Sequence, residues 1–199
     1  SVAGGKEMKT KKAAAMLLTA AVGIGALALP AAVPQETGVF ATETAYAATP
    51  SASKLASAAK KAYGDSYLPN YKLDKDEIKS KYGVDSSLYA SAYAEVPMIS
   101  AQVDQLVIFK AKNASSKKKI LTAVKKYQKD LKADTMQYPM NSLKIQGSKV
   151  YANGNYVCFF MLGGSVSKSI EESGSDAKII KAHQQLNKKA VNTVKNKLK

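Results

Sequence analysis

Residues 149–162 read KVYANGNYVCFFML, and this stretch decides the fold class. Two runs that favour β-structure flank the pair Asn153-Gly154. Asn-Gly suits a two-residue hairpin turn of type I′, because both central residues of that turn need a positive φ. We therefore predict a β-hairpin that turns at Asn153-Gly154. Cys158 lies inside the second run, and we expect it to be buried as a small hydrophobic residue.

Two further strands are predicted upstream of the hairpin. Residues 103–111 contain the continuous apolar run LVIF, and a run that is apolar on both faces is typical of a central strand covered on both sides. Residues 89–98 alternate loosely and end close to Pro97, which predicts another strand. Together with the hairpin, these segments predict a small, mainly antiparallel sheet of about three to four strands.

Amphipathic helices are predicted to cover this sheet. From residue 115 or 116 to residue 132, large apolar side chains recur at helical spacing and lysines cover the remaining surface. A cationic amphipathic helix can also lie on a membrane. This stripe has no Trp or Phe, so we favour packing against the sheet. Its members are Ile120, Val124, Tyr127 and Leu131.

Two shorter helices are predicted nearer the amino terminus. Residues 55–62 carry apolar side chains at helical spacing, and Gly64 ends the pattern. In residues 74–83, Asp74 and Glu77 have the spacing of a capping box. Acids and lysines alternate in this second segment, which indicates a solvated helix face in preference to a metal site.

The carboxyl-terminal segment predicts a long basic helix from residue 176 to the end of the chain. His183 falls on its apolar stripe, and we expect a partly buried filler because no second histidine can join it. Residues 134–147 predict a loop with room for one helical turn, and residues 165–175 predict a loop. The expected fold class is α+β, with amphipathic helices on the sheet and this basic helix appended. The expected organisation is an export segment with an extension (1–48), an N-terminal helix and linker (49–73), an α+β core (74–164) and a loop with the basic helix (165–199).

The start of the chain has the pattern of a signal peptide. A cationic segment at residues 8–12 runs into an apolar stretch at residues 13–33. Small residues then stand at the positions that a signal peptidase reads, at Ala45, Ala47 and Ala48. We expect cleavage after Ala47, or after Ala48, and a secreted product that contacts the membrane only through this segment.

An uncleaved membrane anchor is the competing interpretation of this segment. The apolar stretch is rich in Ala and Gly and is broken at Pro30, which disfavours a spanning helix of roughly 20 apolar residues. Lipid anchoring needs a cysteine directly after the apolar stretch, and the chain's one cysteine is Cys158. We take Met8 as the natural start and residues 1–7 as an extension.

The charge of the chain is strongly positive. The chain contains 30 basic and 15 acidic residues, which gives a formal net charge of +15. Every basic residue is lysine. Arginine forks bind guanine and phosphate at two points, so their absence disfavours specific nucleic-acid recognition. A lysine surface gives a diffuse, salt-sensitive field. It suits either solubility or retention on anionic cell-wall polymers, with contacts expected at Lys117, Lys118, Lys125, Lys188 and Lys189.

No catalytic constellation is evident in the sequence. The chain has one histidine and one cysteine, which lie in different predicted elements. Paired carboxylates are the remaining option, and a carboxylate-dependent hydrolase stays an alternative. The acids concerned are Asp85, Glu95, Asp104, Asp130 and Asp134, which lie in different predicted elements. We assign no catalytic residue, cofactor or metal ligand.

Tyrosines point to recognition instead, because each offers an apolar body and a polar tip. Those expected to contact a partner are Tyr67, Tyr71, Tyr89 and Tyr93. We therefore expect a secreted, non-enzymatic binding or interaction domain at the cell envelope. Its expected partner is an anionic wall polymer or an extracellular protein.

Several short motifs occur in a recognisable order. They are VPM at residues 96–98, DQLVIFKAK at residues 104–112, Tyr138-Pro139, and GNYV at residues 154–157. With them, residues 82–163 resemble an uncharacterised domain family of small secreted and lipid-anchored proteins from Gram-positive, clostridial-type bacteria. The resemblance implies export and supplies no catalytic residues. The chain departs from the lipid-anchored members because it lacks a cysteine at the cleavage site.

Overall fold

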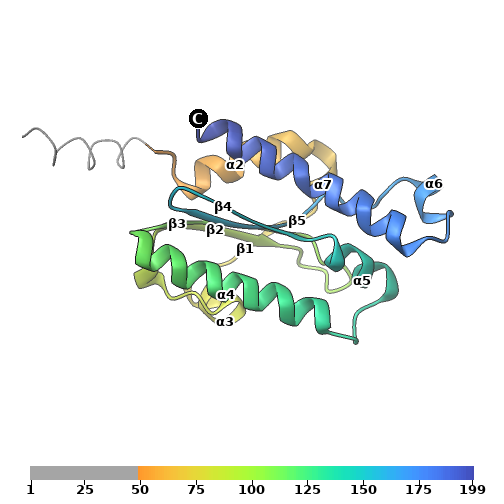
Figure 1. Ribbon diagram of the computed structural model, residues 1–199, viewed down its shortest axis with the longest axis horizontal. Coiled ribbons are helices and arrows are strands. Elements are labelled where there is room, and N and C mark those ends of the chain that lie inside the picture. The colour runs from red at the N-terminus through yellow and green to blue at the C-terminus, as the bar shows by residue number, and fades with distance from the viewer. Residues whose placement is uncertain (1–48) are drawn as a thin grey trace, which may run out of the picture. The chain divides into compact units, whose positions relative to one another are not determined.

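The computed structural model describes residues 49–199, and the predicted export segment and cleavage site lie outside the described residues. Within this range, a five-stranded sheet lies between two layers of helices, which confirms the predicted α+β fold (Figure 1). The helices are α2 (Ala52–Tyr63), α3 (Lys75–Tyr82), α4 (Ala114–Ala133), α5 (Pro139–Gln146), α6 (Lys168–Glu171) and α7 (Asp176–Lys197). The strands are β1 (Tyr71–Lys72), β2 (Tyr89–Val96), β3 (Gln105–Ala111), β4 (Lys149–Asn153) and β5 (Tyr156–Met161).

The sheet is antiparallel throughout and has the order β1-β2-β3-β5-β4. Every residue of β3 and of β5 is buried, so the predicted central strand is confirmed and β5 lies beside it. The sheet has one strand more than the sequence indicated, because the two-residue β1 pairs with the end of β2. Such a short strand carries no alternating pattern of its own.

The hairpin is confirmed, but its turn lies one residue later than predicted. Asn153 pairs with Tyr156, so the two turn residues are Gly154 and Asn155. Gly154 takes the positive φ of 51°. This register directs Val157 and Phe159 into the core on one face of the sheet. A one-residue slip of β5 would send both side chains to the opposite face.

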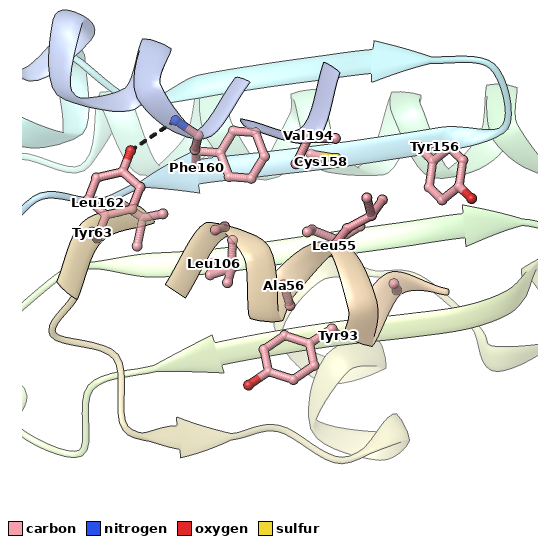
Figure 2. Close-up of a cluster of buried hydrophobic side chains, with 14 residues drawn as sticks. Leu55, Ala56, Tyr63, Tyr93, Leu106, Tyr156, Cys158, Phe160, Leu162 and Val194 are labelled. Carbon is pink, nitrogen blue, oxygen red and sulfur yellow. Dashed lines mark hydrogen bonds between the residues drawn. The ribbon is translucent and has the colours of Figure 1, made fainter. Parts of the chain in front are cut away.

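Helices α2 and α7 cover one face of the sheet and share one core with it (Figure 2). Leu55 of α2 and Val194 of α7 belong to the same buried cluster as Phe160. The Tyr63 hydroxyl joins the two helices, because it donates to the Leu186 carbonyl at 2.6 Å and accepts from the Ala190 amide at 3.1 Å. The basic helix at the carboxyl terminus is therefore part of this layer. Cys158 lies unpaired and fully buried in the same core, as predicted.

Helices α3 and α4 cover the other face. The predicted capping box of α3 is present, with the Asp74 side chain accepting from the Glu77 amide. Helix α4 begins slightly before the predicted start, because the Asn113 side chain caps it by accepting from the Ser116 amide at 2.8 Å. Ile120 of α4 is fully buried against this face.

Two segments predicted as loops contain helices. Residues 134–147 include α5, which begins at Pro139, a residue preorganised for the first helical position. The apolar pattern of α5 is weak because its two buried residues, Lys144 and Ile145, include a lysine. The single turn of α6 lies in the second segment. Between residues 49 and 199, no helix has the length and apolar composition needed to cross a membrane.

Candidate functional site

A cavity of about 350 Å³ lies at the end of the sheet where β3 begins and β5 ends. Five parts of the chain line it: the segment before β1, the connection from β2 to β3, helix α5, the chain that follows β5 through α6, and α7. Its buried residues are Asp104, Lys144, Gly164 and His183. Its exposed or half-buried polar residues are Gln102, Asn141, Ser165 and Glu171.

Asp104 and Lys144 form a buried ion pair in this cavity. Asp104 immediately precedes the central strand β3, and Lys144 lies in the last turn of α5. The Lys144 ammonium donates to Asp104 Oδ2, and the two side chains are 8% and 2% exposed respectively. Lys144 also donates to the Gly164 carbonyl at 2.6 Å, while the Gly164 amide donates to Asp104 Oδ1 at 3.2 Å. Three segments distant in sequence are thus held together.

The register of the sheet explains why Asp104 and Gly164 lie close together. Gln105 of β3 pairs with Met161 of β5, so the start of one strand lies beside the end of the other. Gly164 then turns the chain with a φ of 62°, a conformation that favours glycine. On the other side, the Asn141 amide donates to the Ala101 carbonyl at 2.9 Å and holds α5 against the β2–β3 connection.

Burial removes water from the ion pair of Asp104 and Lys144, and this affects the pKa of the carboxyl group. Burial raises the pKa of Asp104, and the charge and hydrogen bond of Lys144 partly offset this effect. Both carboxylate oxygens of Asp104 already accept hydrogen bonds. Lys144 has three N–H donors, of which two have acceptors among the described residues. One donor of the buried ammonium is left for another group.

His183 completes the buried side of the cavity. It is 3% exposed, and its Nδ1 has no hydrogen-bond partner within residues 49–199. Burial and the nearby Lys144 charge lower its pKa to about 4, so the imidazole is neutral at pH 7. The stripe position predicted for His183 is correct, and the residue is buried more fully than the predicted filler.

Close packing holds His183 in place. The backbone of Gly147 approaches α7 so closely that a Cβ there would lie 2.5 Å from His183 Cβ. One turn further along α7, Asn187 is fully buried and donates to the Gly147 carbonyl at 3.0 Å. The histidine therefore has little freedom to move away from the cavity.

The acids that the sequence offered as catalytic candidates do not converge. Asp104 pairs with Lys144, and Glu95 pairs with Lys60 at 2.9 Å. Asp85 pairs with Lys79, and Asp130 pairs with Lys126. Asp134 accepts a hydrogen bond from the side-chain amide of Gln137. The carboxylate that shares the cavity with Asp104 is Glu171, from α6.

The four tyrosines singled out in the sequence lie on both faces of the sheet. Tyr67 and Tyr93 belong to the α2 side, where both hydroxyls donate to Glu95, at 2.5 and 2.9 Å. Tyr93 is buried. Tyr89 packs on the α4 side, and the exposed Tyr71 donates to Glu77 of α3. They do not form one contiguous contact surface.

The five lysines expected to contact anions also lie on two helices. Lys117, Lys118 and Lys125 belong to α4, and Lys188 and Lys189 belong to α7, which lies across the sheet. The ammonium of Lys189 lies 5.2 Å from the centre of the Tyr63 ring. These lysines therefore form two separate groups, one on each helix.

Sequence reasoning missed Lys144, Glu171 and Gly164 as members of one site. Lys144 and Glu171 lie in segments predicted as loops, and no spacing pattern links them to Asp104. The signals for this site that the sequence did offer were Asp104 among the candidate acids and the histidine on the apolar stripe of residues 176–199. Among the described residues, no group of three or more His, Cys, Asp or Glu side chains is placed to hold a metal ion.

The comparisons with known proteins agree with the predicted resemblance to an uncharacterised family. Residues 62–162 match the family described as a domain of unknown function (DUF4358). No curated protein and no solved structure matches the chain. The matched region contains all five strands with Asp104 and Lys144, whereas Gly164, Glu171 and His183 lie after it. This match spans half of the length of the chain, and the chain therefore belongs to the DUF4358 family.

Proposed function

We propose that the chain is an extracellular, non-enzymatic binding domain whose ligand occupies the cavity around Asp104. One observation carries the proposal: a buried ion pair lines the same cavity as His183, whose buried Nδ1 has no hydrogen-bond partner among residues 49–199. Burying two charges costs desolvation energy that hydrophobic residues of similar volume would not cost. Polar groups placed at such a cost beside a cavity support a role in recognition.

The charges of the lining indicate the class of ligand. Lys144 offers a remaining N–H donor, which suits a carboxylate or carbonyl oxygen. Glu171 has no ion-pair partner among residues 49–199, and its carboxylate suits an ammonium group. A volume of about 350 Å³ is at the small end of ligand sites. These features together favour a small zwitterion, an amino acid or a short peptide.

Binding is favoured over hydrolysis by the state of Asp104. A two-carboxylate mechanism needs one group as acid and a second as base or nucleophile. Both oxygens of Asp104 are engaged by Lys144 and the Gly164 amide, which leaves Glu171 as the lining carboxylate free to act. We therefore place the hydrolase second.

Calorimetric titration of the full chain with pools of amino acids and dipeptides tests this function. We expect one pool to bind, and Glu171→Gln to weaken that binding by about tenfold, the loss of one charged contact. Glu172→Gln is the matched control, because Glu172 is exposed, is the next residue in the chain and does not line the cavity. Failure of every pool to bind, or equal effects of both variants, would overturn the proposal.

The extracellular part of the proposal is supported by the sequence pattern of residues 8–48. Sequencing of the amino terminus of the secreted product should give a start at Ala48 or Thr49. A mature start well before Ala45 would contradict the predicted cleavage. Retention on anionic wall polymers through lysines is the alternative role, and it predicts release of the protein from cells by concentrated salt.

A further inference from the structure

A second hollow lies beside the edge strand β4. It is a groove of about 400 Å³ formed by α4, the end of α5, β4 and α7. The groove and the cavity share no lining residue. The lining residues used below are Lys125, Gln128, Lys132, Gln146, Ser148 and Lys149, and we call this hollow the lysine groove.

Helical spacing places one wall of the lysine groove. Lys125, Gln128 and Lys132 stand at i, i+3 and i+7 of α4, so they share one side of the helix. Lys149 opens the facing strand β4, which pairs only with β5 and leaves its outer edge without a strand partner in the described sheet. Lysines from a helix and from a sheet edge therefore meet in one hollow.

Amide side chains fix the walls to each other. Gln128 Nε2 donates to both the carbonyl and the hydroxyl of Ser148 at 3.0 Å, which joins α4 to the start of β4. Gln146 Nε2 donates to the Lys132 carbonyl at 3.0 Å, which joins the end of α5 to α4. The lysine side chains thus project from a cross-linked frame.

The positive charge of the lysine groove is not balanced by protein acids. No carboxylate lines the groove, and within residues 49–199 none of its three lysines forms an ion pair. The nearby acid of α4, Asp130, is paired with Lys126 at 2.5 Å. Burial and the charge of Lys149 lower the pKa of Lys132, which indicates that the two ammonium groups repel each other. A bound anion would relieve this repulsion.

We propose that the lysine groove binds phosphate groups, as a site separate from the amino-acid cavity. A phosphate offers several strong acceptor oxygens, and lysines on two walls can donate to it from different directions. The basic character of the whole chain adds attraction at longer range, with a net charge of +15. The phosphate can come from a free oligophosphate or from the phosphodiester backbone of an anionic polymer.

Titration of the full chain with inorganic tripolyphosphate tests the proposal directly. We expect Lys125→Gln/Lys132→Gln/Lys149→Gln to weaken binding by about tenfold or more, because three charged contacts are lost. The matched control is Lys61→Gln/Lys75→Gln/Lys112→Gln, which removes the same charge from exposed lysines outside the groove. This control should stay within about twofold of the parent chain, because only distant, screened charge is lost. Thermal melts of both variants show whether each still folds.

A second arm with poly(glycerol phosphate) separates the two sources of phosphate. Loss of tripolyphosphate binding in the groove variant alone supports a site for free oligophosphates, and loss of polymer binding in that variant alone supports a polymer site. No binding of either probe by the parent chain would overturn the proposal. Equal losses in the groove variant and its control would also overturn it, because net charge alone would then explain the binding.

Discussion

Lys144 of α5 donates to the carboxylate of Asp104, 40 residues earlier in the chain, and this pair closes the end of the sheet over a polar cavity. The pair joins the strand that lies at the centre of the sheet to a helix that the sequence did not reveal. Gly164 is bonded to both partners. The stability of this end of the molecule and the proposed ligand site therefore depend on the same contacts.

Lys144→Met should be strongly destabilising. The substitution leaves the buried carboxylate of Asp104 without its cation, and breaking one side of a buried pair costs about 3–5 kcal/mol. Urea denaturation measures the free energy of unfolding. Lys126→Met is the control, because its pair with Asp130 is exposed and such pairs contribute about 0–1 kcal/mol. Similar losses in the two variants would contradict the assigned role of Lys144.

His183 should titrate far below an ordinary histidine. Burial and the charge of Lys144 lower its pKa to about 4, and it is the chain's one histidine, so its imidazole signals are unambiguous. An NMR titration of the folded chain should give a midpoint near this value. A midpoint near 6.5, the value of a free imidazole, would show that His183 is solvated.

The same pKa shift predicts a pH dependence of stability. Between pH 6.5 and about 4 the unfolded chain binds a proton at His183 that the folded chain does not, so stability falls as the pH falls. Over this whole interval the shift corresponds to up to about 3 kcal/mol of stability, and we expect His183→Gln to remove this pH-dependent part. Urea unfolding of both chains at several pH values measures the difference, and parallel pH profiles would contradict it.

Gly147→Ala should disturb α5 and α7 together. The added methyl group would lie 2.5 Å from His183 Cβ and 3.2 Å from the Ile180 carbonyl oxygen. The φ of Gly147 is −78°, so the effect is steric and not one of backbone strain. We expect a loss of about 1–3 kcal/mol, as for overpacked cores, and shifted imidazole signals. An unchanged melting temperature with unchanged imidazole signals would show that this contact is loose.

Tyr67→Phe should destabilise the α2 side of the sheet. The Tyr67 hydroxyl donates at 2.5 Å to Glu95, whose side chain is 8% exposed. Hydrogen bonds to charged groups contribute about 1.5–3 kcal/mol, and we expect a loss in this range in chemical denaturation. Tyr71→Phe is the matched control, because its hydroxyl also donates to a carboxylate, at Glu77, but in an exposed setting. A loss in the control as large as that of Tyr67→Phe would contradict the structural role of Glu95.

Most of the fold could be predicted because its signals are local. The hairpin at residues 149–162, the apolar run of β3 and the stripe of α4 each depend on side chains close in sequence. The turn at Gly154 and Asn155 differs from the prediction by one residue. The register of the hairpin depends on which side chains pack into the cores on the two faces of the sheet, and this packing is not local. Helix α5 is longer than the single turn that the sequence allowed, because a buried lysine interrupts its apolar pattern.

The site could not be predicted in the same way. Asp104, Lys144 and His183 come together through strand register and through the packing of α5 on α7, which are long-range properties. A lysine in a predicted loop gives no indication that it is buried. His183 lines a cavity because of how α7 packs against Gly147 and α5, and this packing is again a long-range property.

We propose that the cavity lined by Asp104, Lys144 and His183 binds a ligand. The most direct measurement is the NMR spectrum of the single imidazole during titration of the full chain with the amino-acid and dipeptide pools. We expect saturable shifts of the His183 ring signals with one of these pools. The shifts should be reduced in Glu171→Gln and kept in Glu172→Gln. Ring signals that stay unchanged at saturating concentrations of every pool would contradict it.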